Sequence, residues 1–153
     1  MDRQLQVKPT KTADLADIHA IECLCFSDPW TQEMLFDVLK NPHSNCFTAV
    51  LDGKIIGFCM MWNFEAIGEG QIGNIAVNPD FRGFGAGDIL VCAMLDIARQ
   101  KGVAEIFLEV RQGNVAAQRL YEKHGFEAFG IRKNYYTKPI EDAVLMKINS
   151  NRR

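Results

Sequence analysis

The chain has no apolar run long enough to cross a bilayer and no Gly-Lys-Ser/Thr tripeptide. A membrane-spanning helix needs roughly 18 to 20 consecutive apolar residues, and residues 1–4 lack the apolar segment of a signal peptide. Without the tripeptide, the phosphate loop of the Walker type is excluded. We therefore expect a cytoplasmic protein without membrane contact.

The chain is also poor in features that bind metals or nucleic acids. It contains five cysteines, an odd number with no Cys-x-x-Cys pair, and three scattered histidines. This pattern favours neither a disulfide framework nor a metal site. The formal net charge is −2 and the sequence pI is about 5.9, which are not the values of a strongly basic nucleic-acid binder. We expect no metal and no direct nucleic-acid binding.

The size and composition are those of one soluble globular domain. The 153 residues are 48% hydrophobic and 24% charged, which is enough to bury a real core. No repeat, linker or low-complexity segment divides the chain, so we predict a single domain over residues 1–153. The composition leaves both a monomer and a weak dimer open.

Local patterns predict alternating helices and strands. Thr12 is a plausible N-cap for a helix carrying Leu15, Ile18, Ile21 and Leu24, and Thr31 for a second helix. Asp52-Gly53 suits a tight turn that joins strands 46–51 and 54–63. Further strands are expected at 5–8, 70–77, 104–110, 126–131 and 143–148, with helices from the glycine run to about residue 100 and over 114–124. The order predicts a mixed α/β protein.

The glycine-rich run over residues 82–87 is the most informative stretch. It follows the strand 72–77 and precedes an apolar helical segment. A loop with few side chains therefore leads directly into the first backbone amides of a helix. Such a junction binds anions, because the first helical N–H groups are unpaired and the helix dipole is positive there. Asp88 stands where a dinucleotide-binding fingerprint needs its last glycine. The alternative is a glycine-rich turn that only connects strand and helix.

Four motifs then occur in a fixed order and together resemble the GNAT acetyltransferases. They are Asn74 to Pro79, Arg-x-x-Gly-x-Gly over 82–87, Leu-Glu-Val-Arg over 108–111, and Leu-Tyr-Glu-Lys-His-Gly-Phe over 120–126. Phe-Ser-x-Pro-Trp over 26–30 and Arg-x-Asn-Tyr-Tyr over 132–136 are similar to the ribosomal-protein-alanine N-acetyltransferases within that family. The resemblance implies a mostly antiparallel sheet of about six to seven strands with about four helices.

The resemblance also implies acetyl-CoA as co-substrate. Backbone groups of Ile75, Ala76 and Val77 would meet its acetyl and pantetheine parts, and Asn114 would contact it unless it serves only as a helix N-cap. The pyrophosphate would lie on the loop and helix start formed by Arg82, Gly83, Phe84, Gly85, Ala86, Gly87 and Asp88. Arg82 could instead be a solvated charge.

Four further side chains match functional positions of the family, two of them reacting groups and two on the substrate side. Glu109 matches the proton acceptor, directly or through a water, although strand alternation alone favours an exposed position. Tyr121 matches the proton donor, although a helical tyrosine is more often a core residue. Tyr135 and Tyr136 resemble an aromatic pair on the substrate side, and alternation in a strand lets at most one face the substrate.

The implied function is transfer of an acetyl group to the N-terminal alanine of a small-subunit ribosomal protein. The partner would be the N-terminal segment of that protein. Two alternatives remain, because proteins of one fold can act on different acceptors. The chain could acetylate another amine, such as a lysine side chain or a polyamine, or it could sense CoA without catalysis. Glu65 and Glu69 are either an acidic rim for a basic segment or part of a solvated loop.

Overall fold

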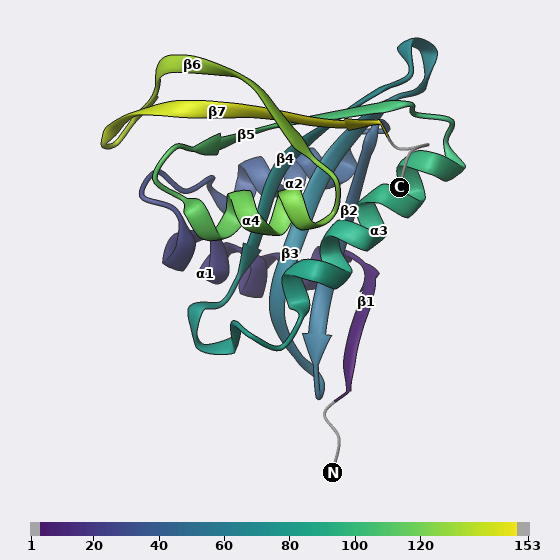
Figure 1. Ribbon diagram of the computed structural model, residues 1–153. Coiled ribbons are helices and arrows are strands. Elements are labelled where there is room, and N and C mark those ends of the chain that lie inside the picture. Colours follow the sequence, from purple (N-terminus) through teal and green to yellow (C-terminus); the bar gives the residue numbers. More distant parts are fainter. Residues whose placement is uncertain (1–3, 150–153) are drawn as a thin grey trace.

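A seven-stranded sheet runs through the protein, with helices on both faces (Figure 1). The computed structural model describes residues 4–149. In chain order the strands and helices are β1 (Leu5–Pro9), α1 (Leu15–Cys25), α2 (Gln32–Lys40), β2 (Ser44–Leu51), β3 (Lys54–Phe64), β4 (Glu69–Val77), α3 (Ala86–Gln100), β5 (Glu105–Arg111), α4 (Val115–Lys123), β6 (Glu127–Thr137) and β7 (Ile140–Asn149).

The sheet has the order β1-β2-β3-β4-β5-β7-β6, and within residues 4–149 β4 and β5 form the one parallel pair. That pair is short: residues 69–71 of β4 lie against residues 105–107 of β5. Beyond it β4 continues to Val77 and β5 to Arg111, and the two strands diverge (Figure 1). The divergence opens the middle of the sheet.

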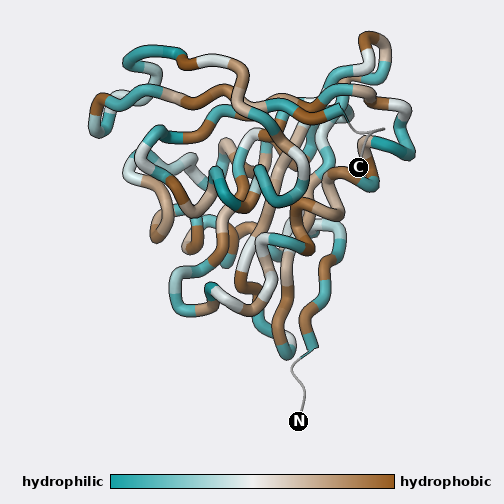
Figure 2. Tube along the Cα trace, in the orientation of Figure 1, coloured by the Kyte–Doolittle hydropathy of each residue, from teal (hydrophilic) through white to brown (hydrophobic). Residues whose placement is uncertain are grey.

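Each face of the sheet has its own hydrophobic core. Leu90, Met94 and Leu95 of α3 pack with β3 residues such as Met61 on one face, and Tyr121 of α4 joins this core. On the other face α1 and α2 pack against a second group of buried residues, Phe58, Met60 and Ala76 among them. Hydrophobic residues accordingly concentrate along the central strands and α3 (Figure 2). Central strands buried on both faces need apolar side chains in both directions.

Several local predictions are confirmed. Asp52 and Gly53 both have positive φ, 50° and 85°, as the turn between β2 and β3 requires. The Thr31 hydroxyl accepts a hydrogen bond from the Met34 amide at 3.1 Å and caps α2. Gly102, with φ of 72°, follows the end of α3. Within residues 4–149 no helix is both long and apolar enough to span a membrane.

Two local predictions are wrong. Thr12 begins a short 3₁₀ turn, and α1 starts only at Leu15. The prediction that Leu24 shares one apolar helix face with Leu15 is also wrong. At 3.6 residues per turn, α1 makes about 2.5 turns between these two residues. Leu24 therefore lies on the opposite face and is 62% exposed, whereas Leu15, Ile18 and Ile21 are buried.

The last two strands are longer than expected, because they form one hairpin that extends to Thr137 and Ile140. The sequence 132–140 is polar and aromatic and lacks the apolar alternation from which a strand is read. Pairing with β7 imposes the extended backbone there. This extension carries β6 to the mouth of the opening between β4 and β5.

Gly57 tests how tightly the central strands pack. A Cβ at this position would lie 2.9 Å from the carbonyl oxygen of Ala76 in β4, so the strands would have to separate. We expect Gly57→Ala to lower the free energy of unfolding by about 1–3 kcal/mol, as overpacking does. Urea unfolding measures this.

The control for that measurement is Gly130→Ala in β6, where the added Cβ would meet Leu145 at an ordinary 3.6 Å. Equal losses of stability in the two variants would contradict the packing argument.

Candidate active site

A cleft of about 780 Å³ lies where β4 and β5 diverge. Its walls come from the ends of α1 and α4, the segment after α1, β3, β4, β5 and the β6–β7 hairpin. The lining side chains used below are Glu22, Trp30, Trp62, Gln71, Glu109, Arg111, Asn114, Tyr121, Tyr135 and Tyr136.

Glu109 reaches the cleft from β5. It is half-buried and alternates with Leu108 and Val110, which point into the core on the other face of the sheet. Its Oε2 accepts a hydrogen bond of 2.9 Å from Nε2 of Gln71 in β4. This bond joins the last paired residue of β4 to a residue of β5 two positions beyond the paired region, and it orients the carboxylate in the cleft.

Tyr121 reaches the same cleft from α4. It is 5% exposed and its ring meets Phe126 edge to face, with centroids 5.7 Å apart. It is thus both a core residue and a cleft-lining one. Burial raises the pKa of Tyr121 well above its ordinary value, and nearby Cys59 and Tyr136 raise this pKa further. The hydroxyl therefore keeps its proton at neutral pH.

The predicted acetyl-binding residues lie along β4. Ile75 lines the cleft, Ala76 is buried in the core under α1, and Val77 packs on the α3 side. β4 pairs with β3 along one edge, and its other edge is unpaired with β5 beyond Gln71. The Cys25 thiol donates to the Val77 carbonyl at 3.3 Å, which ties the end of α1 to this strand.

The glycine loop lies outside this cleft, at the start of α3. Gly83 and Gly85 have φ of 87° and 88°, a left-handed conformation that favours glycine. α3 begins after Gly85, and no side-chain cap is present at this end in the part of the chain that the structure describes. Ala86 is buried in the core, and Arg82 and Phe84 are on the exposed side of the loop.

Gly87 has a different reason to be glycine. A Cβ there would lie 2.9 Å from a methyl carbon of Leu120, so its absence lets α4 pack closely on α3. Asp88, in the first turn of α3, is held by His124 at 2.8 Å and Lys123 at 3.0 Å. These two partners, His124 foremost, lower the pKa of Asp88. The pyrophosphate site on residues 82–88 stays a prediction.

Asn114 is the N-cap of α4, and its contact with the cofactor stays a prediction. Its Oδ1 accepts from the Ala117 amide at 3.2 Å and caps α4, and the residue also lines the cleft. Because the cap uses the carbonyl oxygen of the side chain, the amide nitrogen is the group left for a ligand.

Tyr135 and Tyr136 both line the cleft, although regular alternation in a strand would put only one of them there, and which of them faces the substrate stays a prediction. The alternation of β6 is interrupted between Arg132 and Tyr136, where the pairing with β7 shifts register. Asn134 lies in that interval with a positive φ of 53°, and its backbone N–H donates to Oδ1 of Asp142 at 2.9 Å. The two rings meet at 88° with centroids 5.0 Å apart. Burial, foremost among several causes, raises the pKa of Tyr136 to about 12.

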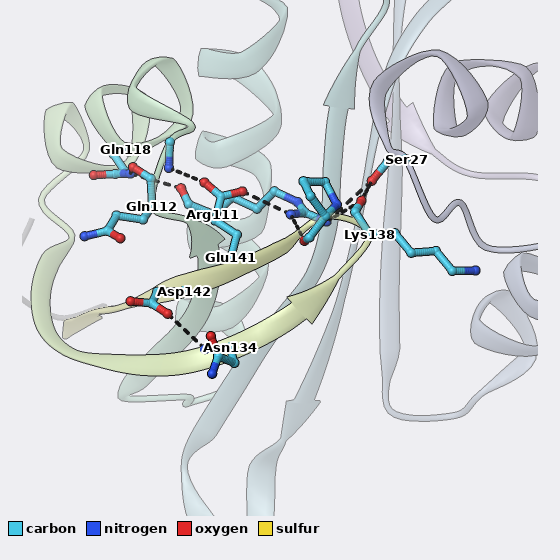
Figure 3. A network of polar contacts seen from close by, with 10 residues as sticks. Ser27, Arg111, Gln112, Gln118, Asn134, Lys138, Glu141 and Asp142 are labelled. Atoms are coloured by element: carbon cyan, nitrogen blue, oxygen red, sulfur yellow. Dashed lines mark hydrogen bonds and ion pairs between the residues drawn. The ribbon is translucent and has the colours of Figure 1, made fainter.

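Arg111, at the end of β5, fastens the hairpin over the cleft (Figure 3). Its guanidinium donates to the carbonyl oxygens of Lys138 at 3.2 Å and Pro139 at 3.1 Å, and it pairs with Glu141 at 3.0 Å. Arg111 also lies over the Tyr136 ring, 4.3 Å from its centroid. The planar guanidinium, with its five donors, suits this set of partners.

The same network reaches the opposite wall. Ser27, just after α1, donates to the Lys138 carbonyl oxygen and receives a 3.4 Å hydrogen bond from Arg111. Glu141 also accepts from the Gly113 amide at 2.7 Å, and these contacts, Arg111 first, lower the pKa of Glu141. The segment after α1 and the β6–β7 hairpin are thus joined across the cleft (Figure 3).

Similarity to known proteins agrees with this geometry. A model of the acetyltransferase (GNAT) family matches residues 15–126. The chain belongs to the GNAT acetyltransferase family. It is an acetyl-CoA-dependent N-acetyltransferase, and the resemblance inferred from its four motifs is confirmed.

Relatives within the family are similar over nearly the whole chain. A Bacillus subtilis protein is 34% identical over 152 residues, 99% of each chain, and is named provisionally as a [ribosomal protein bS18]-alanine N-acetyltransferase. The Escherichia coli enzyme of that name is 33% identical over 144 residues, 93% of this chain and 95% of its own.

Solved structures confirm the fold of the GNAT enzyme. A crystal structure of the Escherichia coli alanine N-acetyltransferase superimposes with a TM-score of 0.86 at 32% identity, covering 95% of this chain and 94% of the other. A Salmonella typhimurium protein, provisionally described as an acetyltransferase with its cofactor acetyl-CoA, shares the fold with a TM-score of 0.82 at 16% identity, covering 97% of this chain and 95% of the other.

The residues of this acetyltransferase fit a thioester of CoA on structural grounds. The unpaired edge of β4 offers main-chain donors and acceptors to an extended ligand. At the end of that strand, the left-handed glycines lead into the uncapped start of α3, where helical amides and the helix dipole favour a phosphate. Among the described residues, no group of three or more His, Cys, Asp or Glu side chains is arranged to hold a metal.

Glu22 is a functional candidate that the sequence analysis missed. It lies on α1, is 1% exposed, and accepts hydrogen bonds from the Trp30 amide at 2.8 Å and from Asn74 Nδ2 at 2.7 Å. It therefore ties the segment after α1 to β4 beside the cleft. A helical glutamate gives no sign in the sequence of such burial. Trp62 and Gln71 were missed for a similar reason, since each is one polar or aromatic residue in an apolar strand.

Burial raises the pKa of Glu22 despite these hydrogen bonds. Between the ordinary and the raised pKa the folded protein binds a proton that the unfolded chain does not, so folding becomes more favourable as pH falls through that window. Relative to Glu22→Gln, which cannot titrate, the wild type should therefore gain stability as the pH falls from 7 to the ordinary carboxyl pKa of 4.5. Urea unfolding of both proteins at the two pH values tests this, and a constant difference would contradict it.

Proposed function

We propose that this acetyltransferase modifies the N-terminal α-amine of a ribosomal protein that begins with alanine, of the bS18 kind. The observation that carries the proposal is that Glu109 of β5 and Tyr121 of α4 both line one cleft beside the open edge of β4. The names of the two relatives support the acceptor. The ribosomal substrate also supports the expected cytoplasmic location.

The first task of the site is to deprotonate the amine. An α-amine has a pKa of about 7.7 to 8.0, so near pH 7 most of it is protonated and needs only a weak base. Glu109 accepts this proton directly or through a water, and Gln71 holds the carboxylate toward the cleft at 2.9 Å. The free amine can then attack.

The second task is to stabilise charge as the acetyl group moves. Acetyl-CoA, when bound, supplies the acetyl group as a thioester. A main-chain N–H on the open edge of β4 near Ile75 donates to the developing oxyanion. Tyr121 donates its hydroxyl hydrogen toward the leaving sulfur as the new C–N bond forms and the C–S bond breaks. Because the raised pKa of Tyr121 exceeds that of a thiol, about 8.5, the tyrosine acts mainly by hydrogen bonding to the thiolate.

Replacing Glu109 tests the base. We expect Glu109→Gln to lower kcat roughly a hundredfold near pH 7, and to recover activity by pH 9, where the amine is deprotonated without help. The carbonyl oxygen of the introduced amide could still accept a hydrogen bond from Gln71, so folding and acetyl-CoA binding should persist. Steady-state kinetics against pH measures the effect.

The matched control is Glu105→Gln, on the same face of β5 but outside the cleft lining formed by the described residues. It should retain near wild-type activity. A Glu109→Gln enzyme with unchanged kcat at pH 7 would remove Glu109 as the base.

Replacing Tyr121 tests the donor. Tyr121→Phe keeps the edge contact with Phe126 and should therefore fold with an unchanged unfolding midpoint. We expect its kcat to fall roughly tenfold or more, because the leaving sulfur loses its hydrogen-bond donor. Full activity of Tyr121→Phe would show that Tyr121 only packs in the core and is not the donor to the leaving sulfur.

The acceptor is tested with two peptides of the same ribosomal N-terminal sequence. One has a free N-terminal alanine and no lysine, and the other has a blocked N-terminus and one lysine. After incubation with acetyl-CoA, intact mass should show one added acetyl group on the first peptide only. Acetylation of the blocked peptide alone would replace this proposal with lysine acetylation, and no product on either would favour a small-molecule acceptor or a sensing module.

A further inference from the structure

Two tryptophans converge above a glycine in the wall of the cleft. In the pairing of β3 with β4, Met60 faces Asn74 and Met61 faces Ile72, so Gly73 is the extra residue of a β-bulge. A Cβ on Gly73 would lie 2.6 Å from Cζ3 of Trp62 and 3.3 Å from Cη2 of Trp30. The indole rings therefore occupy the space that a side chain at position 73 would fill.

Both rings are fixed in this position. Trp30 is held through its backbone amide by the buried carboxylate of Glu22, which also binds Asn74, the residue after Gly73. The ring centroids of Trp30 and Trp62 are 6.3 Å apart at an angle of 56°. Both side chains are half-buried and line the cleft, so their remaining surface faces whatever enters it.

The tryptophan wall lies one side chain away from Glu109. Trp62 and Gln71 are directly opposite in the β3–β4 pairing, which puts their side chains next to each other on one face of the sheet. The Gln71 amide in turn donates to the Glu109 carboxylate. A group bonded to Glu109 therefore has Trp62 as a close neighbour.

We infer that Trp62 is a specificity-determining residue that restricts the first residue of the acceptor to a small side chain. The inference rests on the proposed function. In an α-amino acid the side chain is attached to the carbon that carries the amine, so an amine at Glu109 brings its own side chain to the Trp62–Trp30 wall. The single methyl group of alanine fits beside this wall. A methionine or leucine side chain would collide with the two indole rings, which cannot move away because they already lie against the backbone of Gly73.

Trp62→Ala tests this inference with peptides that differ only in the first residue, alanine against methionine. In the wild type, kcat/KM should favour alanine. In the variant, the ratio of kcat/KM for methionine to that for alanine should rise roughly tenfold to a hundredfold, the range that methylene-sized changes in a pocket produce. Calorimetric titration of the methionine peptide in the presence of CoA should show the same gain in binding.

Two further variants serve as a milder substitution and as a control. Trp62→Phe removes part of the ring, so the ratio of kcat/KM for methionine to that for alanine should rise by a smaller factor. This variant provides the test if Trp62→Ala does not fold. Phe64→Ala removes an exposed ring two residues along the same strand, outside the cleft lining of the described residues, and should leave the ratio unchanged. Unfolding midpoints and acetyl-CoA titration confirm that each variant is intact.

The outcomes separate this inference from the proposed function. A wild-type enzyme that acetylates alanine and methionine peptides equally, or folded Trp62 variants with an unchanged ratio, would overturn the role of Trp62 and leave α-amine acetylation standing. A wild-type enzyme that acetylates no α-amine would overturn both.

Discussion

The separation of β4 from β5 is the constraint on which the rest of the site depends. Parallel pairing ends at Gln71 and Phe107, and both strands continue without each other. A sheet normally satisfies its backbone groups by pairing, so an interior edge left open is an unfilled hydrogen-bonding surface in the middle of the molecule. This edge creates the cleft, places Glu109 on one side of it, and offers main-chain groups on the other.

Polar contacts rather than additional strands hold the two sides of this opening. Glu22 joins α1 and the following segment to β4, and Gln71 bridges β4 to Glu109 on β5. Arg111 fastens the β6–β7 hairpin to the end of β5 and to Ser27 (Figure 3). Hydrogen bonds to charged groups are stronger and more directional than neutral ones, which suits walls that must keep a fixed distance across an open space.

The predictability of the site varied from residue to residue. The glycine loop, Glu109 and Tyr121 lie in motifs that are contiguous in the chain, so their positions were available without a structure. The reach of β6 was underestimated, because the pairing of Arg132, Tyr136 and Thr137 with β7, rather than apolar alternation, continues the strand there. Both tyrosines line the cleft because the register shift around Asn134 breaks the alternation that a regular strand would impose.

By itself the sequence determined the order of helices and strands, the type I′ turn at Asp52-Gly53 and the family motifs, because these depend on neighbouring residues and their spacing. Only the tertiary structure decided which side chains meet. The Ser27 contact with Lys138 and the convergence of Trp62 and Trp30 on Gly73 join segments far apart in the chain. Such contacts depend on strand register and on packing across the sheet, which no local pattern of residues records.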